Sequence, residues 1–176
     1  MITAQQFSQT FEQVSRKQII PLLQCWPSQP DFTRYVKHQM MPAIAGALGC
    51  SVALEYKRID IVFRALPSPE DETVGDAKII AAIEHENNFG GAGAEVRKLR
   101  DLALPLGVLI TYASVHRRPE MLAEFADILA VSDVSSGGVP ESEILVIIGP
   151  YGMNAPTVLT WEYFVSRGGK FQKISL

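Results

Sequence analysis

Two carboxylates separated by a single residue, Glu84 and Glu86, stand at the end of an apolar segment. That segment, residues 78–83, has the length and composition of a short buried strand. Side chains alternate between the two faces of a strand, so both glutamates should project to one side and His85 to the other. Two carboxylates on one face repel each other and resist burial unless a positive charge lies between them. A hard divalent cation that takes oxygen ligands, such as Mg²⁺, would supply that charge.

A third carboxylate has a matching context. Asp60 lies near the start of another strand-like segment, residues 59–63. One strand that brings an Asp and a following strand that brings Glu-x-Glu together predict a metal site at the edge of a sheet. The alternatives without a functional role are that Asp60 caps a turn and that the two glutamates are solvated at a strand end.

Length and composition indicate one globular domain over residues 1–176, because 176 residues are enough for a substantial core and 47% of them are hydrophobic. No apolar stretch approaches the roughly 20 residues needed to cross a bilayer, and the N-terminus does not read as a signal peptide. Cys25 and Cys50 lack metal-ligand spacing and are expected to be reduced in a cytoplasmic protein. The net charge of −3 argues against tight nonspecific binding to nucleic acid, but it leaves room for a local basic cleft.

The hydrophobic pattern predicts an α/β protein. Continuous apolar strands imply a sheet covered on both faces, and the helices between them imply parallel crossovers. Asp31 is expected to cap the second helix and Gly49 to end it, whereas Lys57 and Arg58 should turn a hairpin. An acidic, proline-bearing exposed loop is expected at residues 67–72. The expected helices cover residues 3–23, 31–48, 94–103 and 119–129, and the expected strands cover residues 52–56, 59–63, 78–86, 107–112, 144–149 and 158–165.

This order of elements, with Arg58-Ile59-Asp60-Ile61-Val62-Phe63 and Ala82-Ile83-Glu84-His85-Glu86-Asn87, resembles the core of the PD-(D/E)xK nuclease superfamily. The resemblance covers roughly residues 31–129. It implies a restriction-endonuclease-like mixed sheet flanked by helices, with an αβββαβ core. It also implies that Asp60 and Glu84 bind Mg²⁺ or Mn²⁺.

The chain departs from the pattern of that superfamily at its last motif position, where Glu86 stands in place of the usual Lys. Glu86 would then bind a second metal ion or accept a proton from the attacking water. Lys98, on the next helix, would supply the missing positive charge if the helix is suitably rotated, although alone it reads as a solvated residue. For a further acidic ligand, Glu55 is the first choice and Glu12 the second.

The leading functional hypothesis is a Mg²⁺-dependent phosphodiesterase or endonuclease that hydrolyses nucleic acid, DNA in the first instance. Symmetric cleavage of a duplex would favour a homodimer, and no membrane partner is expected. The alternative is a catalytically inactive nuclease-fold protein that serves binding or assembly. A third hypothesis is a small-molecule-binding α/β protein in which the glycine-rich loop at residues 90–93 holds an anion. A more modest interpretation of this loop is that its glycines let it move over the site when substrate arrives.

Overall fold

The computed structural model describes residues 1–66, 78–131, 142–152, 158–167 and 169–176. The expected acidic loop at residues 67–72 lies outside this part of the chain. The helices are α1 (Ala4–Lys17), α2 (Ile19–Cys25), α3 (Gln29–Tyr35), the π-helical turn η1 (Val36–Met40), α4 (Met41–Ala47), α5 (Phe89–Asp101), the 3₁₀ turn η2 (Val115–Arg117) and α6 (Arg118–Ala130). The strands are β1 (Cys50–Tyr56), β2 (Ile59–Ala65), β3 (Ile79–Glu86), β4 (Leu106–Tyr112), β5 (Glu143–Gly149), β6 (Glu162–Arg167) and β7 (Lys170–Ile174).

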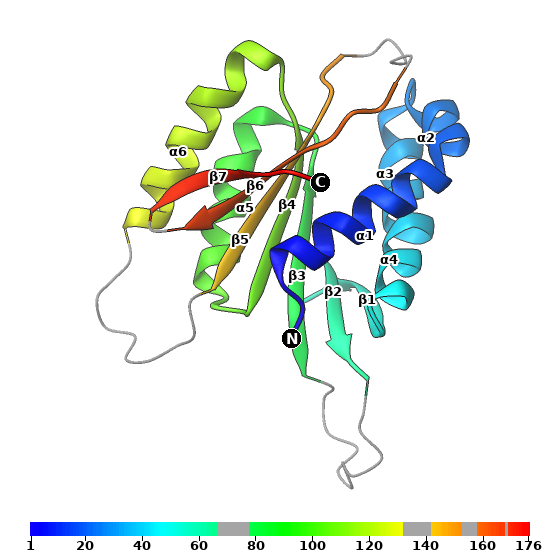
Figure 1. Ribbon diagram of the computed structural model, residues 1–176, viewed down its shortest axis with the longest axis horizontal. Coiled ribbons are helices and arrows are strands. Elements are labelled where there is room, and N and C mark those ends of the chain that lie inside the picture. Colours follow the sequence, from blue (N-terminus) through cyan, green and yellow to red (C-terminus); the bar gives the residue numbers. More distant parts are fainter. Residues whose placement is uncertain (67–77, 132–141, 153–157, 168) are drawn as a thin grey trace, which may run out of the picture.

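The seven strands form one mixed sheet whose spatial order follows the chain, β1 to β7. Strands β3, β4 and β5 are parallel, and the remaining neighbours are antiparallel. Helices α1 to α4 cover one face, and α5 and α6 cover the other (Figure 1). The prediction of an α/β protein with a mixed sheet flanked by helices is therefore confirmed. Every residue of β4 is buried, as expected for a central strand covered on both faces.

Local sequence signals explain most of the boundaries. Thr3 and Gln6 form a capping box that starts α1. The hairpin β1–β2 turns at Lys57 and Arg58, which both have positive φ values of 49° and 70°, as a two-residue hairpin turn requires. Gly49, with φ of 68°, follows the last turn of α4 in the left-handed conformation that favours glycine. The hairpin and the role of Gly49 were both predicted.

Four predicted elements differ in the structure. The first helix is divided at Gln18 into α1 and α2. Ser28 rather than Asp31 caps α3, because its side chain accepts a hydrogen bond from the Asp31 N–H. Helix α5 begins at Phe89, so the glycines of residues 90–93 lie in its first turns and do not form a loop. The predicted strand at residues 158–165 begins at Glu162 as β6 and is followed by β7, which the pattern did not predict.

Among the described residues, no helix combines the length and the apolar character that crossing a membrane requires. Cys25 and Cys50 are both free thiols, as the sequence predicted.

Candidate functional site

Asp60 lies where the hairpin β1–β2 meets β3. Its Oδ2 atom accepts a hydrogen bond of 3.1 Å from the backbone N–H of His85, and its Oδ1 atom accepts one of 2.8 Å from Nζ of Lys37. The regular alternation of β2 is interrupted here, because Ile59 packs under α5 whereas Ile61, two residues on, packs under the N-terminal helices. On the facing strand Glu55 has a positive φ of 52°. This local irregularity lets Asp60 contact both β3 and a lysine from the N-terminal helical layer.

Glu84, on β3, is the buried carboxylate of the site, and 4% of its side chain is exposed. Its Oε2 atom accepts a hydrogen bond of 3.4 Å from the Asp60 N–H, so Asp60 and Glu84 are direct neighbours. Its Oε1 atom lies 2.8 Å from Nζ of Lys98, on α5. Lys98 also lies 2.6 Å from Oε2 of Glu95 and donates a hydrogen bond of 3.0 Å to the backbone oxygen of Arg58. The Lys98 ammonium thus ties α5 to the hairpin and to β3.

We call this set the carboxylate–lysine cluster; it consists of Lys37, Glu55, Asp60, Glu84, Glu95 and Lys98. Four carboxylates and two ammonium groups give it a formal charge of −2 when all are ionised. Burial raises the pKa of Glu84 to about 7; Lys98 opposes that rise, and Asp60 and Glu95 add to it. Burial alone would lower the pKa of Lys98, but its contacts with Glu84 and Glu95 outweigh burial and raise it. The cluster therefore holds an unbalanced negative charge near neutral pH.

The predicted residues Asp60, Glu84 and Lys98 are brought together by the fold. Glu55 joins them through Lys37, whose Nζ lies 2.9 Å from its Oε1 atom, although 70% of the Glu55 side chain is exposed. Glu12, the second choice, lies elsewhere: it forms an ion pair with Arg16 and accepts a hydrogen bond from the Tyr163 hydroxyl, on β6. The choice of Glu12 was therefore wrong, because α1 crosses a different part of the sheet.

Glu86 shares the α5 face of the sheet with Glu84, as the strand alternation predicted. Its Oε1 atom accepts a hydrogen bond of 2.5 Å from the Asn88 N–H. A Cβ atom added at Gly91 would lie 2.7 Å from its Oε2 atom. A side chain at Gly91 would therefore require the Glu86 carboxylate to move, and the glycines predicted to form a flexible loop lie instead in the first turns of α5.

Two members of the cluster, Lys37 and Glu95, were not predicted as site residues from the sequence. Lys37 lies in the π-helical turn η1, which changes the phase of the helix ahead of Pro42, so no regular helical pattern places it. Glu95 lies one turn before Lys98 on α5, and this i, i+3 spacing of opposite charges was the available signal.

No protein-family model matches this sequence, and no curated protein is a detectable relative of it. Any function proposed for the protein therefore rests on the geometry of the site.

A metal site can be tested against this geometry. Among the residues that the structure describes, no three or more His, Cys, Asp or Glu side chains form a group that could hold a metal ion. Mg²⁺ in phosphate-handling sites is usually held by only one or two carboxylates, together with water and substrate phosphate. Asp60 and Glu84 offer hard oxygen ligands from adjoining strands, and carboxylate oxygens carry more lone pairs than the contacts described here use. The two carboxylates supply the oxygen ligands that Mg²⁺ takes, and water and phosphate would have to supply the remaining ligands.

His85 points to the opposite face of the sheet, as predicted. Its Nε2 atom lies 2.7 Å from the hydroxyl oxygen of Tyr112, and only 7% of the residue is exposed. Burial lowers the pKa of His85 to about 4, so the ring is neutral at physiological pH. Its backbone N–H holds Asp60, whereas its side chain belongs to an aromatic cluster on the other side of the sheet.

Proposed function

We propose that this protein is a divalent-metal-dependent phosphodiesterase that hydrolyses nucleic acid, with Mg²⁺ or Mn²⁺ held by Asp60 and Glu84. The observation that supports it best is that the Glu84 carboxylate accepts a hydrogen bond from the Asp60 backbone N–H and has its pKa raised by burial and in part by the Asp60 charge, in a cluster with a formal charge of −2. A divalent cation would neutralise that charge. When bound, the metal ion would polarise a phosphoryl oxygen and lower the pKa of the attacking water.

The residues around the pair have complementary roles in this proposal. The Lys98 ammonium, close to Glu84, would stabilise negative charge that develops on the phosphoryl oxygens. Lys37 neutralises Asp60 in the free protein and would shift toward substrate phosphate once a cation takes its place. Glu86 is more exposed than Glu84 and would accept a proton from the attacking water. Glu55 would supply a further oxygen ligand at the exposed side of the cluster.

DNA is the first substrate to test, and RNA the second. A homodimer would place two such sites on opposite strands of a duplex, which is the arrangement that symmetric cleavage requires. A cytoplasmic location agrees with two free cysteines.

The test is a cleavage assay on fluorescent single-stranded and double-stranded DNA and RNA, with Mg²⁺, with Mn²⁺ and with a chelator. The variants are Asp60→Asn and Glu84→Gln, with Asp127→Asn and Glu120→Gln as matched controls, because the control acids are exposed on α6. We expect metal-dependent cleavage by the native protein and both controls, and a loss of at least about a hundredfold in the two site variants. Retained circular dichroism would show that these variants are folded. Equal cleavage by Asp60→Asn and by the native protein would contradict the proposal.

A non-enzymatic role is favoured by one specific observation. Asp60 and Glu84 each contact an ammonium group, Lys37 and Lys98, so these two carboxylates have positive partners without a cation. The charge of −2 arises because the same two ammonium groups also contact Glu55 and Glu95. A nuclease-fold protein that binds nucleic acid or assembles with other subunits would need no more than this. Binding of the same oligonucleotides without metal-dependent turnover would select this role.

A further inference from the structure

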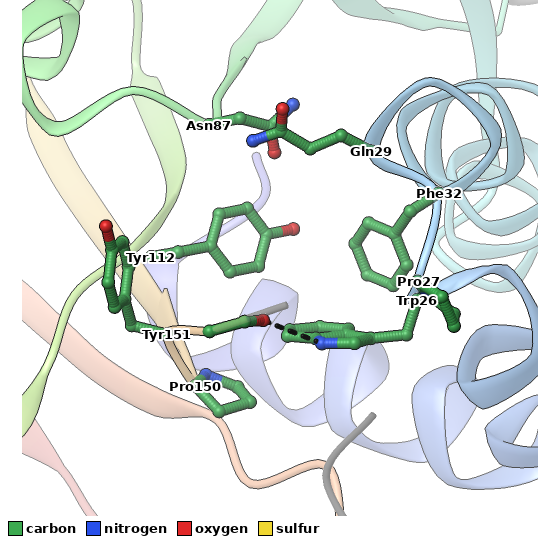
Figure 2. Close-up of a pocket in the computed structure, with 9 residues that line it drawn as sticks. Trp26, Pro27, Gln29, Phe32, Asn87, Tyr112, Pro150 and Tyr151 are labelled. Carbon is green, nitrogen blue, oxygen red and sulfur yellow. Dashed lines mark hydrogen bonds between the residues drawn. The ribbon is translucent and has the colours of Figure 1, made fainter. Parts of the chain in front are cut away.

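A cavity of about 390 Å³ opens beside the carboxyl end of β3, on the face that the N-terminal helices cover. In Figure 2, Gln29 and Asn87 line one side and Trp26 lies opposite, with aromatic rings between them. The lining of the cavity includes Trp26, Gln29, Phe32, Asn87, Tyr112 and Tyr151. They come from α3 and the segment before it, from the turn after β3, from β4 and from the segment after β5.

The aromatic wall of this cavity is formed by rings that pack against one another. The rings of Trp26, Phe32 and Tyr112 meet edge to face, with centroids 4.9 Å, 5.8 Å and 6.0 Å apart. Nε1 of Trp26 donates a hydrogen bond of 3.1 Å to the backbone oxygen of Gly152. The Tyr112 hydroxyl is held by His85 at 2.7 Å, and a Cβ atom at Gly149 would lie only 2.7 Å from the Tyr112 ring. The wall is therefore formed before any ligand enters.

The polar groups of the cavity are carboxamides and not charges. None of the described lining residues carries a charged side chain. Nδ2 of Asn87 donates a hydrogen bond of 2.8 Å to Oγ1 of Thr33, and its Oδ1 atom can act as an acceptor. Gln29 lies exposed at the rim and offers both a donor and an acceptor. A neutral planar heterocycle with donors and acceptors on its edge matches this lining.

The tight packing of the rings argues against a cation as the ligand. An aromatic cage for a quaternary ammonium group surrounds the cation with ring faces. Here the three inner rings contact one another edge to face, so their faces do not surround an open space that could hold a cation. The absence of a carboxylate among the described lining residues points the same way.

We propose that this cavity binds an unpaired nucleobase of the nucleic-acid strand, by stacking on the exposed ring of Tyr151 and by hydrogen bonds to Gln29 and Asn87. Asn87 directly follows Glu86, so the turn after β3 joins the carboxylate face of the sheet to the cavity. This inference rests on the proposed function and extends it: the substrate is a single strand or a locally unpaired duplex. Aromatic stacking of a base does not depend on its identity, so tolerance of all four bases is expected.

The test measures binding in a chelator, so that it does not depend on cleavage. A fluorescent hexanucleotide is compared with an abasic strand of the same length and charge, and with the same sequence in a duplex. Free adenosine and thymidine are added as competitors, which separates a base in a strand from a free nucleoside. The variants are Tyr151→Ala and Gln29→Ala, both at exposed positions, with Gln172→Ala on β7 as a matched control.

We expect the hexanucleotide to bind about tenfold more tightly than the abasic strand and the duplex, and Tyr151→Ala to lose about fivefold to a hundredfold. Gln29→Ala should weaken binding, and Gln172→Ala should leave it unchanged. Equal affinity for the hexanucleotide and the abasic strand would overturn the proposal, as would displacement of the hexanucleotide by free nucleosides that bind as tightly as the strand does. Neither result bears on metal-dependent cleavage by Asp60 and Glu84, so failure of the cavity and failure of the proposed function are distinguishable.

Discussion

Nζ of Lys98 lies 2.8 Å from Oε1 of Glu84, so the helix that follows β3 brings a positive charge to the buried carboxylate of that strand. The resemblance proposed from the sequence predicts a lysine two residues after the glutamate, where this chain has Glu86. In this fold an ammonium group reaches the same glutamate from α5. The pairing makes Glu84 the ionisable group on which most of the predictions depend, because its protonation should affect stability and, under the proposed function, cation binding.

The first prediction concerns the free energy of unfolding as a function of pH. The pKa of Glu84 is about 7 in the folded protein against an ordinary value of 4.5, so the folded state holds the proton more tightly. Its contribution to stability is complete below pH 4.5 and is lost as the pH rises toward 7, by an amount on the order of 3 kcal/mol. Glu84→Gln removes this loss. In urea unfolding, the free energy of unfolding of the variant should therefore rise relative to that of the native protein between pH 5 and pH 8.

Glu120→Gln is the control for that comparison, since this exposed acid should change stability by only a few tenths of a kcal/mol at either pH. A constant difference between Glu84→Gln and the native protein from pH 5 to pH 8 would mean that Glu84 titrates at its ordinary pKa.

Replacing Lys98 tests the ion pair from its other side. Lys98→Met keeps the aliphatic stem but removes the charge, so the pKa of Glu84 should rise further above its ordinary value. At pH 8 we expect the free energy of unfolding to fall by about 2 kcal/mol, a figure reduced from that of a fully buried pair because Lys98 is partly exposed. The cost should be smaller at pH 6, where Glu84 is largely protonated. Lys17→Met, at an exposed position on α1, should show no such pH dependence.

Two neighbouring glycines separate helix propensity from the fit of Glu86. At Gly90 an added Cβ atom would have only Oδ1 of Asn88 nearby, at 3.6 Å, so Gly90→Ala should stabilise the protein by about 0.5 kcal/mol. At Gly91 it would lie 2.7 Å from Oε2 of Glu86, so Gly91→Ala must displace that carboxylate and should lose this gain. Thermal unfolding of both variants is the measurement. Combining Gly91→Ala with Glu86→Ala should restore the gain, and equal stability of the two single variants would show that Glu86 does not constrain α5.

The parts of the site that the sequence predicted depend on local rules. The period of two along β3 placed Glu84 and Glu86 on one face and His85 on the other, and the hairpin turn at Lys57 and Arg58 brought Asp60 beside them. Lys98 could be predicted as a site residue because a single helix, α5, connects β3 to β4.

The remaining parts depend on contacts between distant segments. Lys37 reaches Asp60 through a π-helical turn, whose phase no regular pattern indicates. Helix α5 begins at Phe89 despite the glycines that follow, because Asn88 caps it and Gly91 must pass close to Glu86. The cavity joins Trp26, Asn87 and Tyr151, which are far apart in the chain and carry no shared motif.

The most direct test of the account is a calorimetric titration of Mn²⁺ into the native protein at pH 8, beside Asp60→Asn, Glu84→Gln and the control Glu120→Gln. The carboxylate pair predicts one saturable site in the native protein and the control, lost in both site variants. It also predicts that the affinity falls as the pH is lowered below about 7, where Glu84 takes up a proton. Binding that persists unchanged in both site variants would contradict the assignment of the metal to Asp60 and Glu84.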